Sequence, residues 1–222
     1  MLAPRLFGTI VLALHLSGCL QATADGDGSD SSSSTDDGNA AAQTECVDPV
    51  GQCSSLVCQH PNEGAKHETP CAPLSFDQNP PTSGTHYSVW ASFKVYDAPI
   101  SRGFYVHSLE HGAVVLAYNC DLYQDDCAML ATTMEEFRAG WEQDAKCDGV
   151  TRNRIIVTPD PLLDVPFAAV AWDWSLRGDC FDSDAVSEFI FAHYGQTNED
   201  ICIQGIDPLD PDPAYPHPSD CP

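Results

Sequence analysis

The sequence has few basic residues, and this shortage excludes one large class of partners. Only 9 of its 222 residues are Lys or Arg, against 33 Asp or Glu, so the formal net charge is −24. If residues 1–18, which contain Arg5 and no acidic residue, are removed on export, the charge becomes 9 minus 1 minus 33, or −25. A chain this acidic repels polyanions, so we expect no nucleic acid among its partners.

The sequence also lacks an apolar run of about 20 residues, the length needed to span a bilayer. A shorter apolar run, residues 6–14, follows Arg5 and precedes Leu16-Ser17-Gly18-Cys19. A basic start, a short apolar run and small residues are typical of a secretory signal peptide. The last four residues resemble the bacterial lipobox, in which the Cys thiol is acylated before cleavage. We therefore expect residues 1–18 to be a lipoprotein signal peptide and Cys19 to carry lipid. The alternative is an ordinary signal peptide with an unrelated Cys.

A lipid on Cys19 would attach the protein to a membrane of the bacterial cell envelope. Leu20, rather than Asp, follows the anchor, as in lipoproteins sorted to the outer rather than the inner membrane. The rest of segment 19–45 is mostly Asp, Ser, Gly, Ala and Thr. Such a composition cannot bury enough apolar surface to order itself, so it predicts a flexible acidic linker.

Cysteine is abundant, with 11 residues. After Cys19 an even number remains, which in an exported chain predicts a disulfide framework of unknown connectivity. The nearby pair Cys120 and Cys127 could close a local loop, and Cys221 could fix the tail. A zinc cluster of Cys53, Cys58 and His60 is an alternative, but its Cys spacing differs from the usual Cys-x2-Cys. The candidates for disulfides are Cys46, Cys53, Cys58, Cys71, Cys120, Cys127, Cys147, Cys180, Cys202 and Cys221.

Residues 46–206 are predicted to form one disulfide-rich globular domain, followed by a tail rich in Pro and Asp over residues 207–222. Apolar runs of strand length and apolar residues at three- and four-residue spacing indicate buried strands and amphipathic helices. The pattern predicts an α+β fold, in which two helices cover a small mixed sheet after a loop-rich, disulfide-stapled N-terminal part. The expected strands are residues 112–118, 154–158 and 167–174, and the expected helices are residues 128–141 and 182–194.

The residues that could carry chemistry are histidines near predicted turns and strand edges. The string His107-Ser108-Leu109-Glu110-His111 is the densest group, and a His-x3-His pair on one helical turn can direct both rings at one ion. We expect one transition metal ion, copper or zinc, with Glu110 as a weak ligand or as a partner that orients an imidazole. The predicted ligands are His67, His86, His107 and His111.

Two alternatives stay open. In a metal-dependent enzyme, the same ion would keep an open position and Glu110 would act as the general base. The string His107-x-x-Glu110-His111 matches the inverzincin metalloproteases, but their chemistry requires it inside a long helix. In a metal-free structural or interaction domain, hydrogen bonds would satisfy the histidines. A protein partner or small-molecule substrate is not identified by the sequence.

Four strings of the sequence are distinctive in combination: Asn79-Pro80-Pro81-Thr82-Ser83-Gly84-Thr85-His86, Val95-Tyr96, Val106-His107-Ser108-Leu109-Glu110-His111-Gly112-Ala113-Val114-Val115 and Ala169-Val170-Ala171-Trp172. Taken together they resemble the domain of unknown function family 3105 (DUF3105), found in exported or membrane-anchored bacterial proteins. The resemblance runs from about His67 to Glu199. In that family a His precedes the Pro-Pro turn, as His67 does, and an acidic residue tends to close the domain, as Glu199 does. The family has no assigned activity, so the resemblance supports the choice of residues and implies no reaction.

Overall fold

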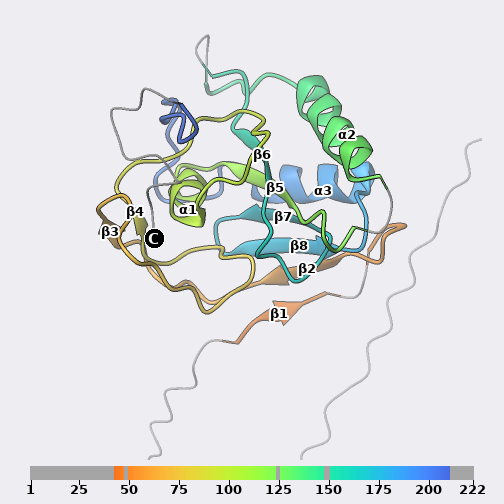
Figure 1. The fold of residues 1–222 in the computed structure, drawn as a ribbon, viewed down its shortest axis with the longest axis horizontal. Helices are drawn as coiled ribbons and strands as arrows, with labels where there is room; N and C mark the ends of the chain where they lie inside the picture. The colour runs from red at the N-terminus through yellow and green to blue at the C-terminus, as the bar shows by residue number, and fades with distance from the viewer. Residues whose placement is uncertain (1–42, 48–49, 124–125, 148–150, 211–222) are drawn as a thin grey trace, which may run out of the picture. The chain divides into compact units, whose positions relative to one another are not determined.

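A six-stranded mixed sheet forms the centre of the fold (Figure 1). The computed structural model describes residues 43–47, 50–123, 126–147 and 151–210. The predicted signal peptide, Cys19, most of the predicted linker, Cys221 and the tail from residue 211 onward lie outside the described residues.

The sheet has the strand order β1-β2-β8-β7-β5-β6. All neighbouring strands run antiparallel except β5 and β6, which are parallel. A separate two-stranded parallel ladder pairs β3 with β4. The strands are β1 (Glu45–Cys46), β2 (Leu56–Gln59), β3 (His67–Glu68), β4 (His86–Tyr87), β5 (Val114–Tyr118), β6 (Ile155–Pro159), β7 (Phe167–Ala171) and β8 (Trp174–Gly178).

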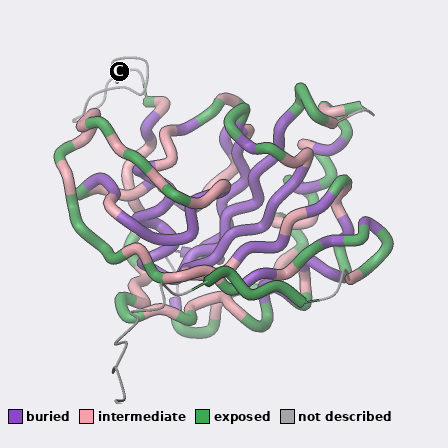
Figure 2. Tube along the Cα trace, turned by 90° about the horizontal axis from the view of Figure 1, so that it is seen from below, coloured by how far each residue is buried: buried purple, intermediate pink, exposed green. Residues whose placement is uncertain are grey.

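The central strands β5 and β7 are buried on both faces, as Figure 2 shows for the middle of the fold. Alternate side chains of these strands therefore enter two separate cores. One core includes Val115, Ala117 and Val170 and packs against helix α1 (Arg102–Glu110). The other core packs against α2 (Cys127–Gly140) and α3 (Ser183–His193). The predicted α+β class with a mixed sheet is confirmed.

Helix α1 was not predicted, and its burial explains why. Eight of its nine residues are buried, so the helix has no polar face to give a periodic pattern. Gly103 allows this close packing, because a Cβ there would lie 2.4 Å from a Leu74 methyl carbon and 2.7 Å from the Tyr87 ring. Among the described residues, three helices therefore cover the sheet, rather than the predicted two.

The predicted single strand over residues 167–174 is wrong in detail. It contains strand β7, a two-residue turn at Trp172 and Asp173, and the first residue of β8. Asp173 has a φ of 62°, the left-handed conformation that tight hairpin turns require and Asp tolerates. Trp172 therefore lies in the turn, and Trp174 begins β8.

The predicted helices α2 and α3 are confirmed within about two residues of their expected ends. Asp182 caps α3, because its side chain accepts hydrogen bonds from the backbone amides of Asp184 and Ala185. In the part of the chain that the structure describes, no helix has the length and hydropathy to cross a membrane.

Four disulfides join described cysteines, as expected for an oxidising compartment. The local Cys120–Cys127 pair is present. Cys53 and Cys58 are both used in disulfides, so they supply no thiolates to the alternative zinc cluster with His60. Cys71 is also disulfide-bonded. The four pairs are Cys46–Cys58, Cys53–Cys180, Cys120–Cys127 and Cys147–Cys202.

Candidate metal centre

The short β3–β4 ladder brings two of the predicted ligands together. His67 and His86 are direct register partners in this parallel pair, although 19 positions separate them in sequence. Their rings lie 4.8 Å apart between centroids. The pairing is held by backbone hydrogen bonds, including those from His86 N to Lys66 O and from Ser88 N to Glu68 O.

Helix α1 supplies the next two side chains from its last turn. His107 and Glu110 are three residues apart, so their side chains lie on one face of the helix. The helix ends immediately afterwards, because Gly112 adopts a φ of 83° and its amide turns back to Leu109 O. A Cβ at Gly112 would lie 2.9 Å from Gly195 Cα, so only glycine fits this close approach.

The three rings of His67, His86 and His107 form a nearly equilateral triangle. The centroid distances are 4.8 Å for His67–His86, 4.6 Å for His67–His107 and 4.8 Å for His86–His107. Oε2 of Glu110 lies 3.3 Å from His67 Nε2, 3.0 Å from His86 Nε2 and 3.9 Å from His107 Nε2. One ligand atom from each of these four residues thus lies within 4.8 Å of every other.

These distances fit a tetrahedral metal site. An ion with bonds of about 2.0–2.1 Å places neighbouring ligand atoms about 3.3–3.4 Å apart. The contacts from Glu110 Oε2, at 3.0 Å, 3.3 Å and 3.9 Å, span this value. The remaining pairs of ligand atoms lie within 4.8 Å of one another, so the four side chains together could hold one ion.

Backbone carbonyls fix the direction in which two of the rings face. Nδ1 of His86 donates to Gly84 O at 2.8 Å, and Nδ1 of His107 donates to Tyr87 O at 2.6 Å. Because each neutral imidazole carries only one proton, Nε2 of each ring is left with a lone pair. We call the space between His67, His86, His107 and Glu110 the centre. Metal-binding histidines are oriented in this way, by an acceptor on the nitrogen that does not bind the ion.

Burial keeps these rings neutral. Burial and the neighbouring His111 and His86 rings lower the pKa of His107 to about 3. Burial also lowers the pKa of His86, although the Gly84 carbonyl and Glu110 oppose this change. Imidazole binds metal ions in its neutral form, so both rings are ready to act as ligands near neutral pH.

One contact in this cluster places two lone pairs against each other. Nε2 of neutral His86 has no proton to donate, yet it lies 3.0 Å from Oε2 of Glu110. A shared proton would relieve this single contact. An ion at the centre would instead accept lone pairs from all four side chains at once, including those of His67 and His107.

His111 is separated from the other predicted ligands. It caps the C-terminus of α1, and its Nε2 lies 3.2 Å from His107 Nε2 and 3.4 Å from Glu199 Oε2. It groups with Glu110 and Glu199, not with His67 and His86. Its Nδ1 is buried without a hydrogen-bond partner in the described parts of the chain. The structure therefore divides the expected four-histidine set into two groups that share Glu110.

Two side chains of the two ligand groups, those of His67 and Glu199, reach solvent. The side chains of His67 and Glu199 are 44% and 47% exposed, whereas those of His86, His107 and His111 are no more than 3% exposed. Trp90 covers His111 and His107, with its ring centroid 4.3 Å and 5.2 Å from theirs. Trp90 was not among the predicted site residues, since nothing in its local sequence distinguishes it from a core tryptophan.

The inverzincin alternative fails on the geometry. Its string must lie inside a long helix, but α1 ends at Glu110 and strand β5 begins at Val114. Glu110 also lies in the ligand cluster itself, where its carboxylate contacts the histidines directly. It is therefore placed to bind an ion rather than to activate a water from outside the ligand shell.

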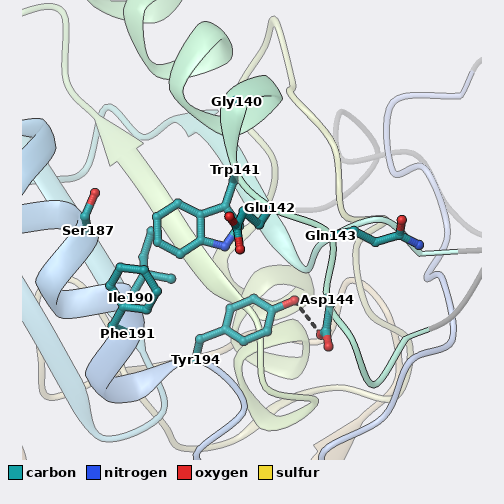
Figure 3. Close-up of a pocket in the computed structure, with 9 residues that line it drawn as sticks. All are labelled: Gly140, Trp141, Glu142, Gln143, Asp144, Ser187, Ile190, Phe191 and Tyr194. Atoms are coloured by element: carbon teal, nitrogen blue, oxygen red, sulfur yellow. Dashed lines mark hydrogen bonds between the residues drawn. The ribbon is translucent and has the colours of Figure 1, made fainter.

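A cavity of about 440 Å³ lies apart from the centre, between the C-terminal ends of α2 and α3. Figure 3 shows Trp141, Phe191 and Tyr194 lining it, and Tyr194 donates to Asp144 at 2.7 Å. No histidine of the cluster lines it. Buried Arg154 connects the two regions, because it donates to Asp144 and, at 2.8 Å, to the carbonyl of His111.

Comparison with known proteins identifies one family. A family model described as "Protein of unknown function (DUF3105)" matches residues 67–204. This range begins at His67 and includes every residue of both ligand groups. No curated protein and no solved structure matches the chain.

Proposed function

The chain belongs to the DUF3105 family, whose function is unknown, and we propose that it is a lipid-anchored metal-binding protein of the bacterial cell envelope. The observation that carries the metal-binding part is the convergence of one atom each from His67, His86, His107 and Glu110. Three of these side chains are buried. Bringing them together without a cation would leave buried lone pairs facing one another, which is unfavourable.

The donor set favours zinc or copper(II). It consists of three imidazoles and one carboxylate, with no thiolate or thioether. Soft ions such as copper(I) prefer sulfur ligands, whereas calcium and magnesium prefer oxygen ligands alone. Among the first-row divalent ions, zinc takes a four-coordinate set of this kind most readily.

Four protein ligands around one ion favour binding over catalysis. Structural zinc sites are usually closed by four protein ligands, whereas catalytic sites keep a position for water or substrate. Here Glu110 supplies the fourth ligand atom, beside the histidines. We therefore favour a protein that holds a metal ion over an enzyme that uses Glu110 as a base.

The envelope location is supported by the disulfides and the sequence. Disulfides persist in oxidising compartments outside the cytosol, and nine described cysteines are disulfide-bonded. The lipobox-like Leu16-Ser17-Gly18-Cys19 would supply the anchor, and Leu20 favours the outer membrane. Labelled palmitate should enter the chain in cells and should not enter a Cys19→Ala variant. Equal labelling of both chains would contradict the anchor.

Metal binding is tested by elemental analysis and zinc titration of the full chain, purified in detergent without a histidine tag. We expect at least one equivalent of zinc after dialysis. A His67→Ala variant should bind it at least about a hundred-fold more weakly, because an entire ligand is lost. The side chain of His67 is 44% exposed, so this variant should still fold.

His193→Gln is the matched control, because His193 lies outside the cluster and stacks on Trp174. It should bind zinc as the parent does. A parent chain that stays metal-free after incubation with zinc and with copper would refute the proposed metal site and leave a metal-free interaction domain.

A further inference from the structure

We propose that Glu110, His111 and Glu199 form a second metal subsite, so that the centre holds two divalent ions bridged by the Glu110 carboxylate. This inference rests on the proposed function, because Glu110 belongs to both groups of ligands. It assigns roles to His111 and Glu199, which the first ion does not use.

The geometry of the second group resembles that of the first. Nε2 of His111 lies 3.4 Å from Oε2 of Glu199, close to the spacing of about 3.3–3.4 Å expected for two ligands of one ion. One ligand atom each of Glu110, His111 and Glu199 lies within 4.8 Å of the other two. Water would complete the coordination, since Glu199 is 47% exposed.

Two ions fit this arrangement better than one. Ligand atoms on a single ion can be separated by no more than twice the bond length, or about 4.2 Å. His111 falls outside the group formed by His67, His86, His107 and Glu110, even at a limit of 4.8 Å. The two groups are nevertheless adjacent, because Nε2 of His107 and Nε2 of His111 are 3.2 Å apart. Two-metal sites place their ions about 3.5–4 Å apart, which suits neighbouring groups that share a carboxylate.

The charge around the second group also suits a cation. Glu110 and Glu199 supply two carboxylates. The guanidinium of Arg154 donates to the His111 carbonyl but is already paired with Asp144 and Asp200. Its positive charge is therefore balanced locally.

The second subsite should be the weaker of the two. His86 and His107 are each held by a backbone carbonyl on Nδ1, whereas Nδ1 of His111 is buried and has no such acceptor among the described residues. If His111 binds an ion through Nε2, its proton moves to this unpartnered Nδ1. Missing partners of this kind lower metal affinity by about ten- to a hundred-fold.

A zinc titration of the metal-free full chain in detergent, with the heat of binding measured by isothermal titration calorimetry, tests the proposal. We expect two binding events of one equivalent each, with the second on the order of ten- to a hundred-fold weaker. The Glu199→Gln variant should lose only the second event, because Glu199 is outside the first group. Glu188→Gln, the same change at an exposed position of α3, should keep both events.

The titration distinguishes a failure of the second subsite from a failure of metal binding as a whole. A single event in the parent, unchanged in Glu199→Gln, would refute the second subsite and leave the first intact. Two events that both persist in Glu199→Gln and in a folded His111→Ala variant would place the second ion elsewhere and also refute it. No binding in the parent would overturn both proposals.

Discussion

Replacing Arg154 with Met should destabilise the fold more than any exposed arginine replacement. Arg154 is 2% exposed and pairs with Asp144, whose side chain is 8% exposed, at 2.9 Å. It also pairs with Asp200 and donates to the carbonyl of His111 at 2.8 Å. Removing one partner of a buried ion pair costs about 3–5 kcal/mol, because the other charge is left buried and unpaired.

This loss should be visible in thermal unfolding. In a chain of this size, 1 kcal/mol shifts the midpoint by about 2–4 °C, so Arg154→Met should lower it by about 6–20 °C. The measurement is differential scanning calorimetry of the full chain with its disulfides intact. Arg177→Met is the control, because Arg177 pairs with Asp164, whose side chain is 56% exposed. Such a surface pair contributes about 0–1 kcal/mol. Equal shifts in the two variants would refute the role assigned to Arg154.

Acid provides a second readout of the same network. Burial alone would raise the pKa of Asp144, but hydrogen bonds from Tyr194, the Lys146 amide and Arg154 outweigh it and lower the pKa. A carboxyl with a lowered folded pKa stabilises the fold above its unfolded pKa of about 3.9, and this contribution is lost as the pH falls through the folded value. Between pH 5 and pH 3 the parent should therefore lose more stability than Arg154→Met. An identical acid dependence would contradict this reasoning.

The remaining predictions concern backbone conformation and disulfides. Gly112→Ala should lower the free energy of unfolding by about 2–4 kcal/mol in a guanidinium titration, because the residue has a φ of 83° and its Cβ would meet Gly195 Cα at 2.9 Å. Gly140→Ala, where nothing lies within 4 Å, should instead be neutral or stabilising by up to about 1 kcal/mol; equal effects at the two glycines would contradict the role of Gly112. Replacing Cys53 and Cys180 by Ala should cost about 2 kcal/mol more than replacing Cys46 and Cys58, since the first pair closes a sequence separation of 127 and the second one of 12. The same guanidinium titration would refute this chain-entropy argument if the two double replacements lowered the free energy of unfolding equally.

The sequence predicted the elements whose pattern is local. Helix α3 could be located from its Asp182 cap and its apolar spacing, and β5 from a continuous apolar run. Helix α1 could not, because a helix buried on all sides has no amphipathic period. The β7–β8 turn was missed because Trp172 and Asp173 do not form one of the usual Gly-containing hairpin turns.

The sequence predicted which residues form the candidate site better than it predicted how they are arranged. His67, His86, His107 and Glu110 do converge, as the density of histidines near turns and the family resemblance suggested. The separation of His111 from them could not be predicted, because it depends on where α1 ends. The helix stops at Glu110, so the next residue leaves the helical face and turns toward Glu199.

X-ray absorption spectroscopy of the full chain loaded with one equivalent of zinc tests the central claim most directly. We predict a shell of nitrogen and oxygen atoms at about 2.0–2.1 Å, with the outer-shell scattering of three imidazoles and no sulfur. The scattering should drop to that of two imidazoles in His67→Ala and stay unchanged in His193→Gln. A sulfur shell at about 2.3 Å, or fewer than three imidazoles in the parent, would contradict a metal centre built from His67, His86, His107 and Glu110.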